Sequence, residues 1–137
     1  MPRTFALLIP ALLVTLVAAA APDPKLPPIK RIKDAKPKKS IFKTATRKKP
    51  LVLKSQKDAA KYFGKVNLAN LKKQVDFTQQ FVLVFAWRGS GGDRFRVSVA
   101  ESYPEQISFH YKPGRTRDLR PHVYVYVLRS NVKWRVR

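Results

Sequence analysis

The chain has 137 residues, contains no cysteine and carries 29 Lys and Arg against 8 Asp and Glu, a formal net charge of +21. This length predicts a single domain, and the lack of cysteine excludes a disulfide framework, a thiolate metal site and a cysteine nucleophile. The positive charge favours an anionic partner, such as nucleic acid, an acidic polysaccharide, or a membrane or cell-wall surface.

Residues 1–20 have the composition of a signal peptide. Arg3 supplies a positive charge, residues 5–17 are apolar, and the small residues at 18–21 fit a cleavage site after Ala20. The apolar stretch is shorter than the roughly 20 residues that a membrane-spanning helix needs. We therefore predict an exported protein, periplasmic or extracellular, with no stable membrane span after cleavage. An uncleaved membrane anchor is the alternative.

Residues 21–50 form a strongly basic stretch rich in proline. Eleven Lys and Arg residues oppose only Asp23 and Asp34, and the prolines prevent a continuous helix. Few apolar side chains are available for burial, so we predict a basic Pro/Lys-rich disordered linker. Its charge has two interpretations: an arm that binds polyanions by releasing their counterions, or a solvated linker. The folded domain is predicted to span residues 51–137.

The predicted domain begins with a short edge strand at residues 51–54 and continues with helices. Ser55 followed three residues later by Asp58 is a variant of the capping box, and Gly64 fits the end of that helix. A second helical segment is indicated by apolar residues at i, i+3 and i+7, namely Leu68, Leu71 and Val75. We therefore expect one or two short helices before the remaining strands.

From Asp76 onward apolar residues alternate with polar ones, which is the period of β-strands. The expected strands are residues 81–88, 94–99, 107–112, 122–128 and 132–137. The first is apolar on both faces, as in a central strand, and Ser130-Asn131 fits a two-residue hairpin turn. The predicted fold class is α+β: one or two short helices followed by a five-stranded antiparallel β-meander. The helices would cover one face of the sheet, and the other face would be wet and basic.

The sequence Gly89-Ser90-Gly91-Gly92-Asp93 joins the first two of the alternating strands. Neither a P-loop nor a dinucleotide fingerprint fits, because both need a glycine-rich turn that opens a helix, and here a strand follows. The nucleophile elbow of hydrolases also needs a strand-to-helix turn. Gly89, Gly91 and Gly92 are therefore interpreted as structural residues that supply positive φ for a hairpin turn or bulge.

Other catalytic or metal-binding constellations have little support in the sequence. A serine hydrolase that uses Ser90 with His110 or His122 is the least favoured alternative. The two histidines lack a nearby acidic cluster and are interpreted as polar surface residues rather than metal ligands. We predict a protein that is not an enzyme and has no cofactor and no metal site.

In a meander, the turn at residues 89–93 and the long loop at 113–121 lie at the same end of the sheet. Asp93 is therefore predicted to lie beside one of the loop arginines, Arg115, Arg117 or Arg120. In a structural interpretation, Asp93 and Asp118 form ion pairs that hold the loop. In a functional interpretation, the surplus arginines bind an anion through bidentate hydrogen bonds.

Several short motifs resemble a known family. Val75-Asp76-Phe77, Val82-Leu83-Val84, Gly91-Gly92 and Pro121-His122-Val123-Tyr124-Val125-Tyr126 are similar to the C-terminal domain of PrcB-type protease-complex-stabilising secreted proteins. The resemblance covers residues 75–137 and implies a small secreted α+β domain that acts by protein contact rather than by catalysis. Two features differ from the family pattern: Asp93, where an aromatic residue usually follows the paired glycines, and the Arg-rich loop.

We therefore predict an exported binding module that docks onto an envelope or extracellular protein complex through a basic sheet face and the Arg-rich loop. The candidate binding residues are Arg94, Arg96, His110, Arg115, Arg117, Arg120, Tyr124 and Tyr126. The alternative is binding of an anionic polymer, an acidic glycan or extracellular nucleic acid, driven mainly by the basic stretch at 21–50. Nucleic acid is not the favoured partner, because export argues against a chromosomal role.

Overall fold

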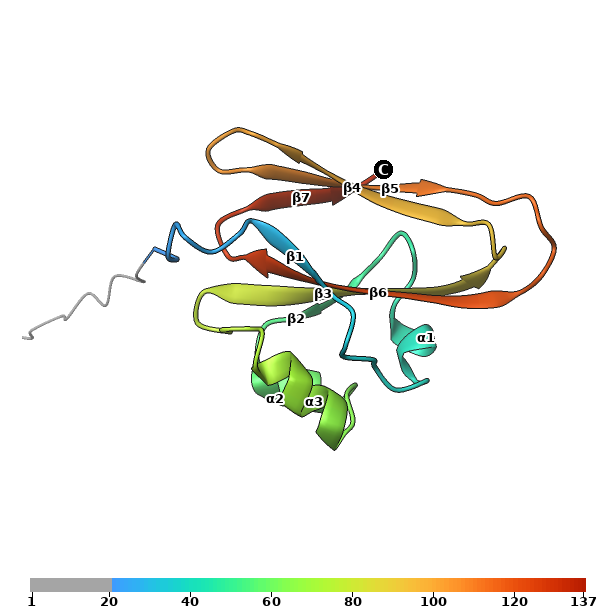
Figure 1. Cartoon of the computed structure of the whole chain (residues 1–137), viewed down its shortest axis with the longest axis horizontal. Coiled ribbons are helices and arrows are strands. Elements are labelled where there is room, and N and C mark those ends of the chain that lie inside the picture. Colours follow the sequence, from blue (N-terminus) through green and yellow to red (C-terminus); the bar gives the residue numbers. More distant parts are fainter. Residues whose placement is uncertain (1–20) are drawn as a thin grey trace, which may run out of the picture.

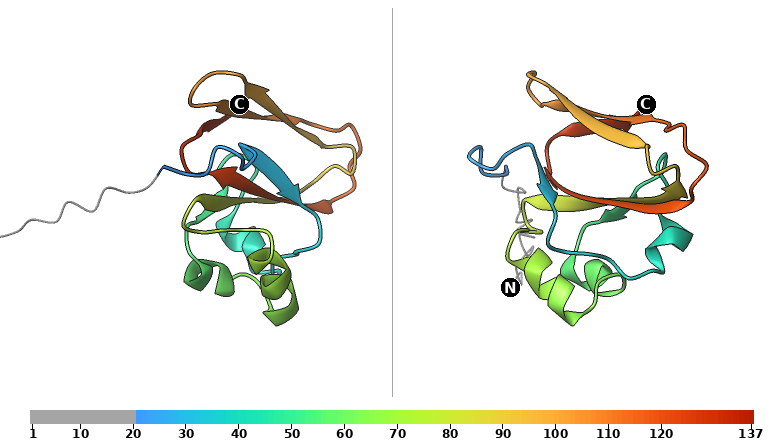
Figure 2. Two further views of the ribbon diagram at one scale, coloured as in Figure 1. Left: turned by 60° about the vertical axis from the view of Figure 1, so that its left-hand side comes forward. Right: turned by 45° about the vertical axis from the view of Figure 1, so that its right-hand side comes forward.

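The computed structural model describes residues 21–137, which fold into three layers: helices, a four-stranded sheet and a three-stranded sheet (Figure 1). The larger sheet has the strand order β1-β6-β3-β2, and the smaller has the order β4-β5-β7. The strands are β1 Ile29–Ile32, β2 Leu51–Leu53, β3 Gln80–Gly89, β4 Arg94–Ala100, β5 Gln106–Lys112, β6 Arg120–Arg129 and β7 Lys133–Val136. The helices are α1 Ile41–Thr44, α2 Gln56–Ala60 and α3 Lys65–Lys72. Figure 2 shows the helices and the smaller sheet on opposite faces of the larger sheet.

The larger sheet is apolar on both faces because both faces are covered. Along β3, Val82 and Val84 pack in a core beneath the helices. The alternate residues Leu83 and Phe85 pack in a second core, which lies between the two sheets and is rich in aromatic rings. β3 is therefore apolar on both sides because each of its faces lies in a core, and within the sheet it lies between β6 and β2.

The expected five-stranded meander is wrong, because residues 21–137 fold mostly into β-structure, and the seven strands of this range divide between two sheets. Residues 90–93 carry the chain from β3 in the larger sheet to β4 in the smaller, where β4 pairs with β5. Ser130-Asn131 does not join paired strands either, since β7 leaves β6 and pairs in parallel with β5. An alternating pattern indicates which side chains are buried, but it does not identify the neighbouring strand.

Residues 22–50 belong to the folded domain, which corrects the expectation of a disordered linker before residue 51. β1 pairs antiparallel with β6, with Ile29 opposite Leu128 and Ile32 opposite Val125. Apolar residues spaced among the lysines are buried in the core beneath the helices, namely Ile32, Ala35, Ile41 and Ala45. Single apolar residues between charged ones show neither a helical nor a strand period, so the sequence pattern did not reveal their burial.

The predicted signal peptide, residues 1–20, lies outside the described residues. Within residues 21–137, none of the helices has both the length and the apolar character needed to cross a membrane.

The helical part of the prediction is partly right. The Ser55 hydroxyl accepts a hydrogen bond from the Asp58 amide at 3.1 Å and caps α2, as the sequence pattern indicated. Gly64 instead precedes α3 as its N-cap. The short strand at residues 51–53 is β2, and it lies at an edge of the larger sheet, as expected.

Arg129 is a buried charged residue that connects three segments of the chain. Its guanidinium forms an ion pair with Glu105 and donates hydrogen bonds to the Leu26 carbonyl oxygen at 2.9 Å and to Asn131 Oδ1 at 2.7 Å. The hydrogen bond from Arg129 also holds the pKa of Glu105 below its usual value. These contacts satisfy a charge that burial would otherwise make costly, and they fix the chain just before β1.

Replacing Arg129 with methionine is expected to loosen the N-terminal segment. The Leu26 carbonyl loses its charged donor, so the amides of β1 should exchange hydrogen on the order of tenfold faster, as expected for one lost hydrogen bond to a charged group. Hydrogen exchange followed by mass spectrometry measures this rate, with Lys72→Met on the exposed surface of α3 as the control. Unchanged exchange in β1 would contradict the anchoring role.

Candidate binding surface

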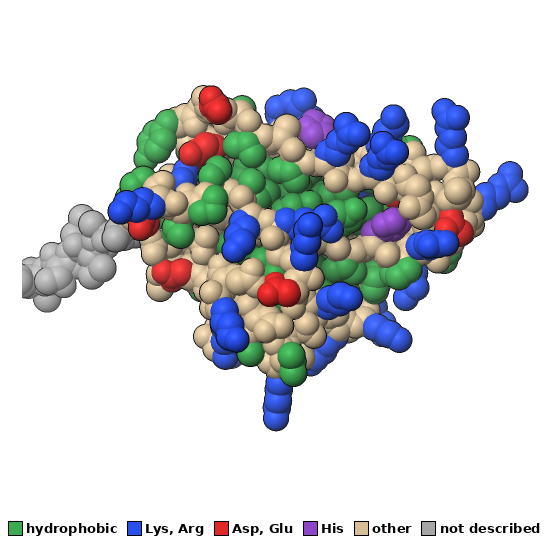
Figure 3. Space-filling view, in the orientation of Figure 1, with side chains coloured by type: hydrophobic (Ala, Val, Ile, Leu, Met, Phe, Trp, Pro, Cys, Tyr) green, Lys and Arg blue, Asp and Glu red, His purple; other side chains and the backbone are tan. Residues whose placement is uncertain are grey.

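The outward side of the β4-β5-β7 sheet is covered with basic side chains. Arg94 lies opposite Lys112, and Arg96 lies opposite His110. On β7, exposed basic residues alternate with the half-buried Trp134 and Val136. We call the six outward basic residues of these strands the basic face: Arg94, Arg96, His110, Lys112, Lys133 and Arg135. Figure 3 shows lysines and arginines gathered along this side of the molecule, near a histidine.

No carboxylate on the same strands neutralises the basic face, because β4, β5 and β7 contain neither Asp nor Glu. The Arg94–Lys112 pair places like charges opposite each other, which destabilises a sheet. Neutral hydrogen bonds orient two further basic groups. Ser98 Oγ lies 3.0 Å from His110 Nε2, and Arg135 donates through Nε to a serine hydroxyl on β5 at 3.2 Å. An anionic partner would relieve the repulsion among these cations.

Of the two predicted tyrosines, Tyr126 is buried and Tyr124 is half-buried, and this corrects the expectation that they form part of an exposed basic face. Tyr126 is buried between the sheets, and burial raises the pKa of its hydroxyl to about 12. The Tyr124 ring stacks on Trp87 with 5.6 Å between centroids, and Arg31 covers it from β1. The smaller sheet covers the side of β6 from which these tyrosines project, and a five-stranded meander would have left that side exposed.

The turn at residues 90–93 and the loop at 113–119 meet at one end of the molecule, as predicted, but Asp93 pairs with no arginine of residues 21–137. Its Oδ1 accepts a hydrogen bond from the Gly114 amide at 2.7 Å, and its Oδ2 accepts one from Trp87 Nε1 at 3.0 Å. His122 Nε2 lies 4.0 Å from Oδ2. Burial alone would raise the pKa of Asp93. The hydrogen bonds to its carboxylate together have a larger effect in the opposite direction, so the pKa lies below its usual value.

Asp118 is the carboxylate that does pair with a loop arginine. Its Oδ2 lies 2.6 Å from Arg120 Nε, and its Oδ1 accepts hydrogen bonds from the Thr116 hydroxyl and from the Gly91 amide. The bonds from Thr116 and Gly91 lower the pKa of Asp118 to about 2. Asp118 therefore holds the two loops together.

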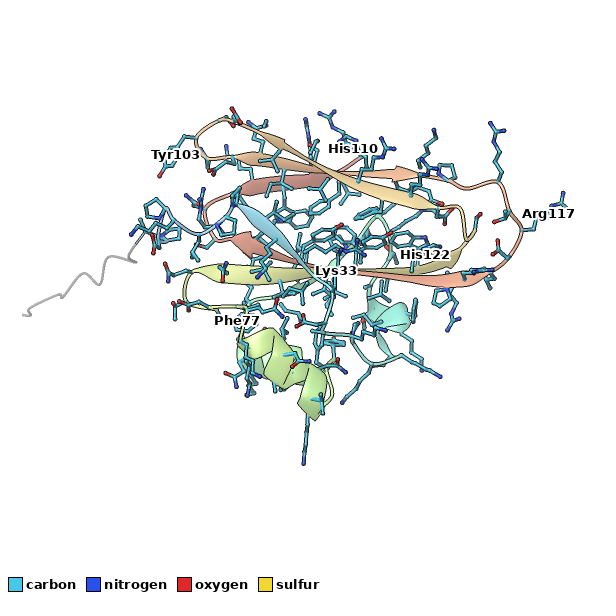
Figure 4. All side chains as sticks on the ribbon, viewed as in Figure 1. Lys33, Phe77, Tyr103, His110, Arg117 and His122 are labelled. Atoms are coloured by element: carbon cyan, nitrogen blue, oxygen red, sulfur yellow. The ribbon has the colours of Figure 1, made fainter. Side chains whose placement is uncertain are left out.

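Arg115 and Arg117 are exposed and form no ion pair with any residue in the described part of the chain. In Figure 4 the Arg117 side chain extends away from the end of the molecule. Their charge is therefore available at the end of the sandwich, beside the basic face.

The glycines of this end do not supply positive φ, which corrects the sequence interpretation: no glycine within residues 21–137 has positive φ. They permit close approach instead. A Cβ atom on Gly91 would lie 2.7 Å from Asp118 Oδ2, and one on Gly114 would lie 2.5 Å from the Gly92 carbonyl carbon. A Cβ atom on Gly89 would collide with the Asp93 carboxylate. Gly114 therefore lies against the backbone of the other loop, whereas Gly89 and Gly91 lie against carboxylates that accept hydrogen bonds, and a side chain at any of the three positions would force these groups apart.

Ser90 and His122 are adjacent but do not form a nucleophile–base pair. His122 Nε2 lies 2.7 Å from the Ser90 carbonyl oxygen, whereas the Ser90 hydroxyl lies 2.6 Å from the hydroxyl of Thr116. In a catalytic triad the base contacts the hydroxyl with one ring nitrogen and the carboxylate with the other. Asp93 lies near the same ring nitrogen that contacts the carbonyl, so this arrangement is a loop-packing network.

The two histidines lie on different sheets, His110 on β5 and His122 on β6. His110 lies on the outer side of the smaller sheet and His122 lies at the inner side of β6 (Figure 4). Within residues 21–137, no group of three or more His, Asp or Glu side chains is arranged to hold a metal ion.

Sequence reasoning placed three of the six basic-face residues correctly on one surface: Arg94, Arg96 and His110. It missed Lys112, Lys133 and Arg135. The alternation of all three with apolar residues was visible in the sequence. Lys133 and Arg135 were missed because the last strand was assigned to the wrong neighbour, so its charges were not placed beside those of β4 and β5.

Comparison with known proteins gives no relative: no family model, no curated protein and no solved structure matches the chain. The resemblance of residues 75–137 to the PrcB-type family stays a prediction that depends on short motifs.

Proposed function

We propose that this protein is an exported, non-enzymatic binding module that docks onto an acidic protein surface through the basic face and the neighbouring exposed arginines of the 113–119 loop. One observation carries the proposal: a sheet surface with six basic side chains, two of them like charges in direct cross-strand opposition, and no carboxylate on the same strands. A sheet surface is broad, so a macromolecular partner fits it better than a small ligand.

The basic stretch at residues 22–50 supports this proposal less than the sheet does. Its lysines are attached to segments that pack on the larger sheet, so they do not form a free arm. A protein partner also agrees with the resemblance of residues 75–137 to a family that acts by protein contact. An anionic polymer such as a glycan or nucleic acid is the competing partner. Binding experiments with poly-L-glutamate and with heparin distinguish the two kinds of partner.

The test compares two double charge reversals that change the net charge equally. Arg94→Glu with Arg96→Glu alters the basic face, and Lys65→Glu with Lys72→Glu alters exposed residues of α3 in the opposite layer. We expect the first variant to bind fluorescent poly-L-glutamate roughly tenfold more weakly in about 50 mM salt, because it replaces local attraction by repulsion. The control should bind within about twofold of wild type, because its charges lie on the other side of the larger sheet from the basic face and salt weakens interactions between such distant exposed charges.

Equal losses in both variants would contradict the proposal, since binding would then follow net charge alone. Stronger binding of heparin than of poly-L-glutamate, lost in the same way in both variants, would favour the anionic polymer.

A further inference from the structure

A groove opens on one side of the molecule, where the two sheets end at short strands. β2 is the last strand of the larger sheet and β7 is the last strand of the smaller, and each has three or four residues. A cavity of about 580 Å³ lies between them, and most of its lining is apolar. The apolar residues are Val52, Phe77, Phe81, Val132 and Trp134, and the polar ones are Lys54, Gln80 and Ser130. The core between the sheets is therefore accessible along this side.

The edge of β7 has unpaired backbone groups beside the groove. The amides of Lys133 and Arg137 donate to the carbonyl oxygens of Glu105 and Phe109, at 3.0 and 2.8 Å, so the odd-numbered residues of this segment face β5. In a parallel ladder the alternate residues face the other way. The backbone N–H and C=O groups of Trp134 and Val136 therefore point to the open edge, where no strand within residues 21–137 pairs with them.

A strand added at this edge would meet two different environments. Successive side chains of a strand point to opposite faces of a sheet. On the inner side lies the apolar groove, and on the outer side lie Lys133 and Arg135 of the basic face. An added strand would therefore place every second side chain in the groove and the others beside cations.

We propose that the edge of β7 binds an extended segment of a protein partner in which apolar and acidic residues alternate. The segment adds a fourth strand to the smaller sheet, its apolar residues fill the groove between β2 and β7, and its carboxylates pair with Lys133 and Arg135. Backbone hydrogen bonds supply affinity and the two side-chain environments supply specificity. This inference deepens the proposed function and rests on it for the acidic character of the partner.

The probe is a fluorescein-labelled peptide of eight residues in which Glu and Val alternate. A peptide of the same composition, with four Glu followed by four Val, is its matched control. Both have the same charge and apolar content, but only the alternating peptide can place all its valines on one face. We expect the alternating peptide to bind at least about tenfold more tightly in fluorescence anisotropy, since a strand is recognised by its two-residue period. Equal binding of the two peptides overturns the inference.

Two variants test the groove and the edge separately. Val136→Pro removes an N–H that points to the open edge and leaves the hydrogen bonds to β5 in place. Val52→Glu places a charge in the groove at a side chain that is 36% exposed, with Val66→Glu on α3, 75% exposed, as its control. Each test variant should weaken binding of the alternating peptide roughly tenfold while binding poly-L-glutamate as wild type does.

The two proposals fail in different ways. If both test variants bind the alternating peptide as tightly as wild type, the edge site is wrong, and the loss of poly-L-glutamate binding in the Arg94 and Arg96 double variant still supports the basic face. If that double variant binds poly-L-glutamate normally, the proposed function is wrong. If Val136→Pro does not fold, Val52→Glu still tests the site, because Val52 is already exposed and the substitution should leave the fold intact.

Discussion

Replacing Asp93 with alanine should lower the free energy of unfolding by about 3 kcal/mol, because one buried and one half-buried donor would lose their acceptor, and each such loss costs roughly 1–3 kcal/mol. These donors are the Trp87 indole and the Gly114 amide, at 3.0 and 2.7 Å from the carboxylate. The two loops at this end of the molecule would also lose a contact that spans 21 residues of sequence. Chemical denaturation measures the change.

Glu101→Ala is the matched control, since it removes the same charge from an exposed side chain that forms no ion pair in the described part of the chain. We expect its stability to stay within about 0.5 kcal/mol of wild type. A loss in the Asp93 variant no larger than that of the control would show that the buried carboxylate does not hold the loops.

The same carboxylate should make the stability depend on pH. The pKa of Asp93 is lower in the folded protein than in the unfolded chain, so the folded state favours its charged form. This contribution is fully present above the unfolded pKa of about 3.9 and is lost as the pH falls through the lower folded pKa. Wild type should therefore lose stability more steeply than Asp93→Ala below about pH 4. If the free energies of unfolding of wild type and Asp93→Ala fell by the same amount below about pH 4, Asp93 would not be the source of this pH dependence.

Replacing Phe85 with alanine should destabilise the protein by about 3–5 kcal/mol, the usual cost of removing a large buried ring. Phe85 has no exposed surface, and its ring centroid lies 4.7 Å from the centroids of both Phe95 and Phe109. These neighbours belong to the smaller sheet, so Phe85 joins one sheet to the other. The cavity would lie at the contact between the sheets, where neither sheet can collapse without moving the whole layer.

Val99→Ala is the control for this substitution, because Val99 is an apolar strand residue with 40% of its surface exposed. Its loss should be less than about 1 kcal/mol, as for other exposed positions. Thermal unfolding of both variants, followed by near-ultraviolet circular dichroism, reports aromatic packing directly. A Phe85 variant that keeps the wild-type signal and stability would show that the sheets are held by other contacts.

The positions of most strands could be predicted from the sequence, whereas their grouping into sheets could not. The alternating stretch at 81–88 corresponds closely to β3 at Gln80–Gly89. A strand that is apolar on both faces must have another layer packed on each face. The sequence pattern is the same whether that layer is a helix or a second sheet. Tyr124 and Tyr126 illustrate the result, because aromatic side chains that fit an exposed strand face fit equally well between two sheets.

The candidate site was predicted in part for the same reason. Arg94, Arg96 and His110 share a face because β4 and β5 are neighbours both in a meander and in the real sheet. Lys133 and Arg135 joined that face only through the parallel pairing of β7, which links segments that no turn connects. The turn glycines show a further limit of sequence-based prediction. A glycine required for the close packing of two loops looks the same in the sequence as a glycine required for positive φ.

The pairing of β1 with β6 sets the order in which this fold can be completed. Lys30 lies opposite Val127, so β1 finds its partner only after the chain has been synthesised as far as β6. Contacts between residues so far apart in sequence slow folding, because the entropy of closing a large loop is lost before the contact forms. A chain that ends before β6 would lack the strand that pairs with β1 and one of the two strands that pair with β3, so the larger sheet would be reduced to β2 and β3.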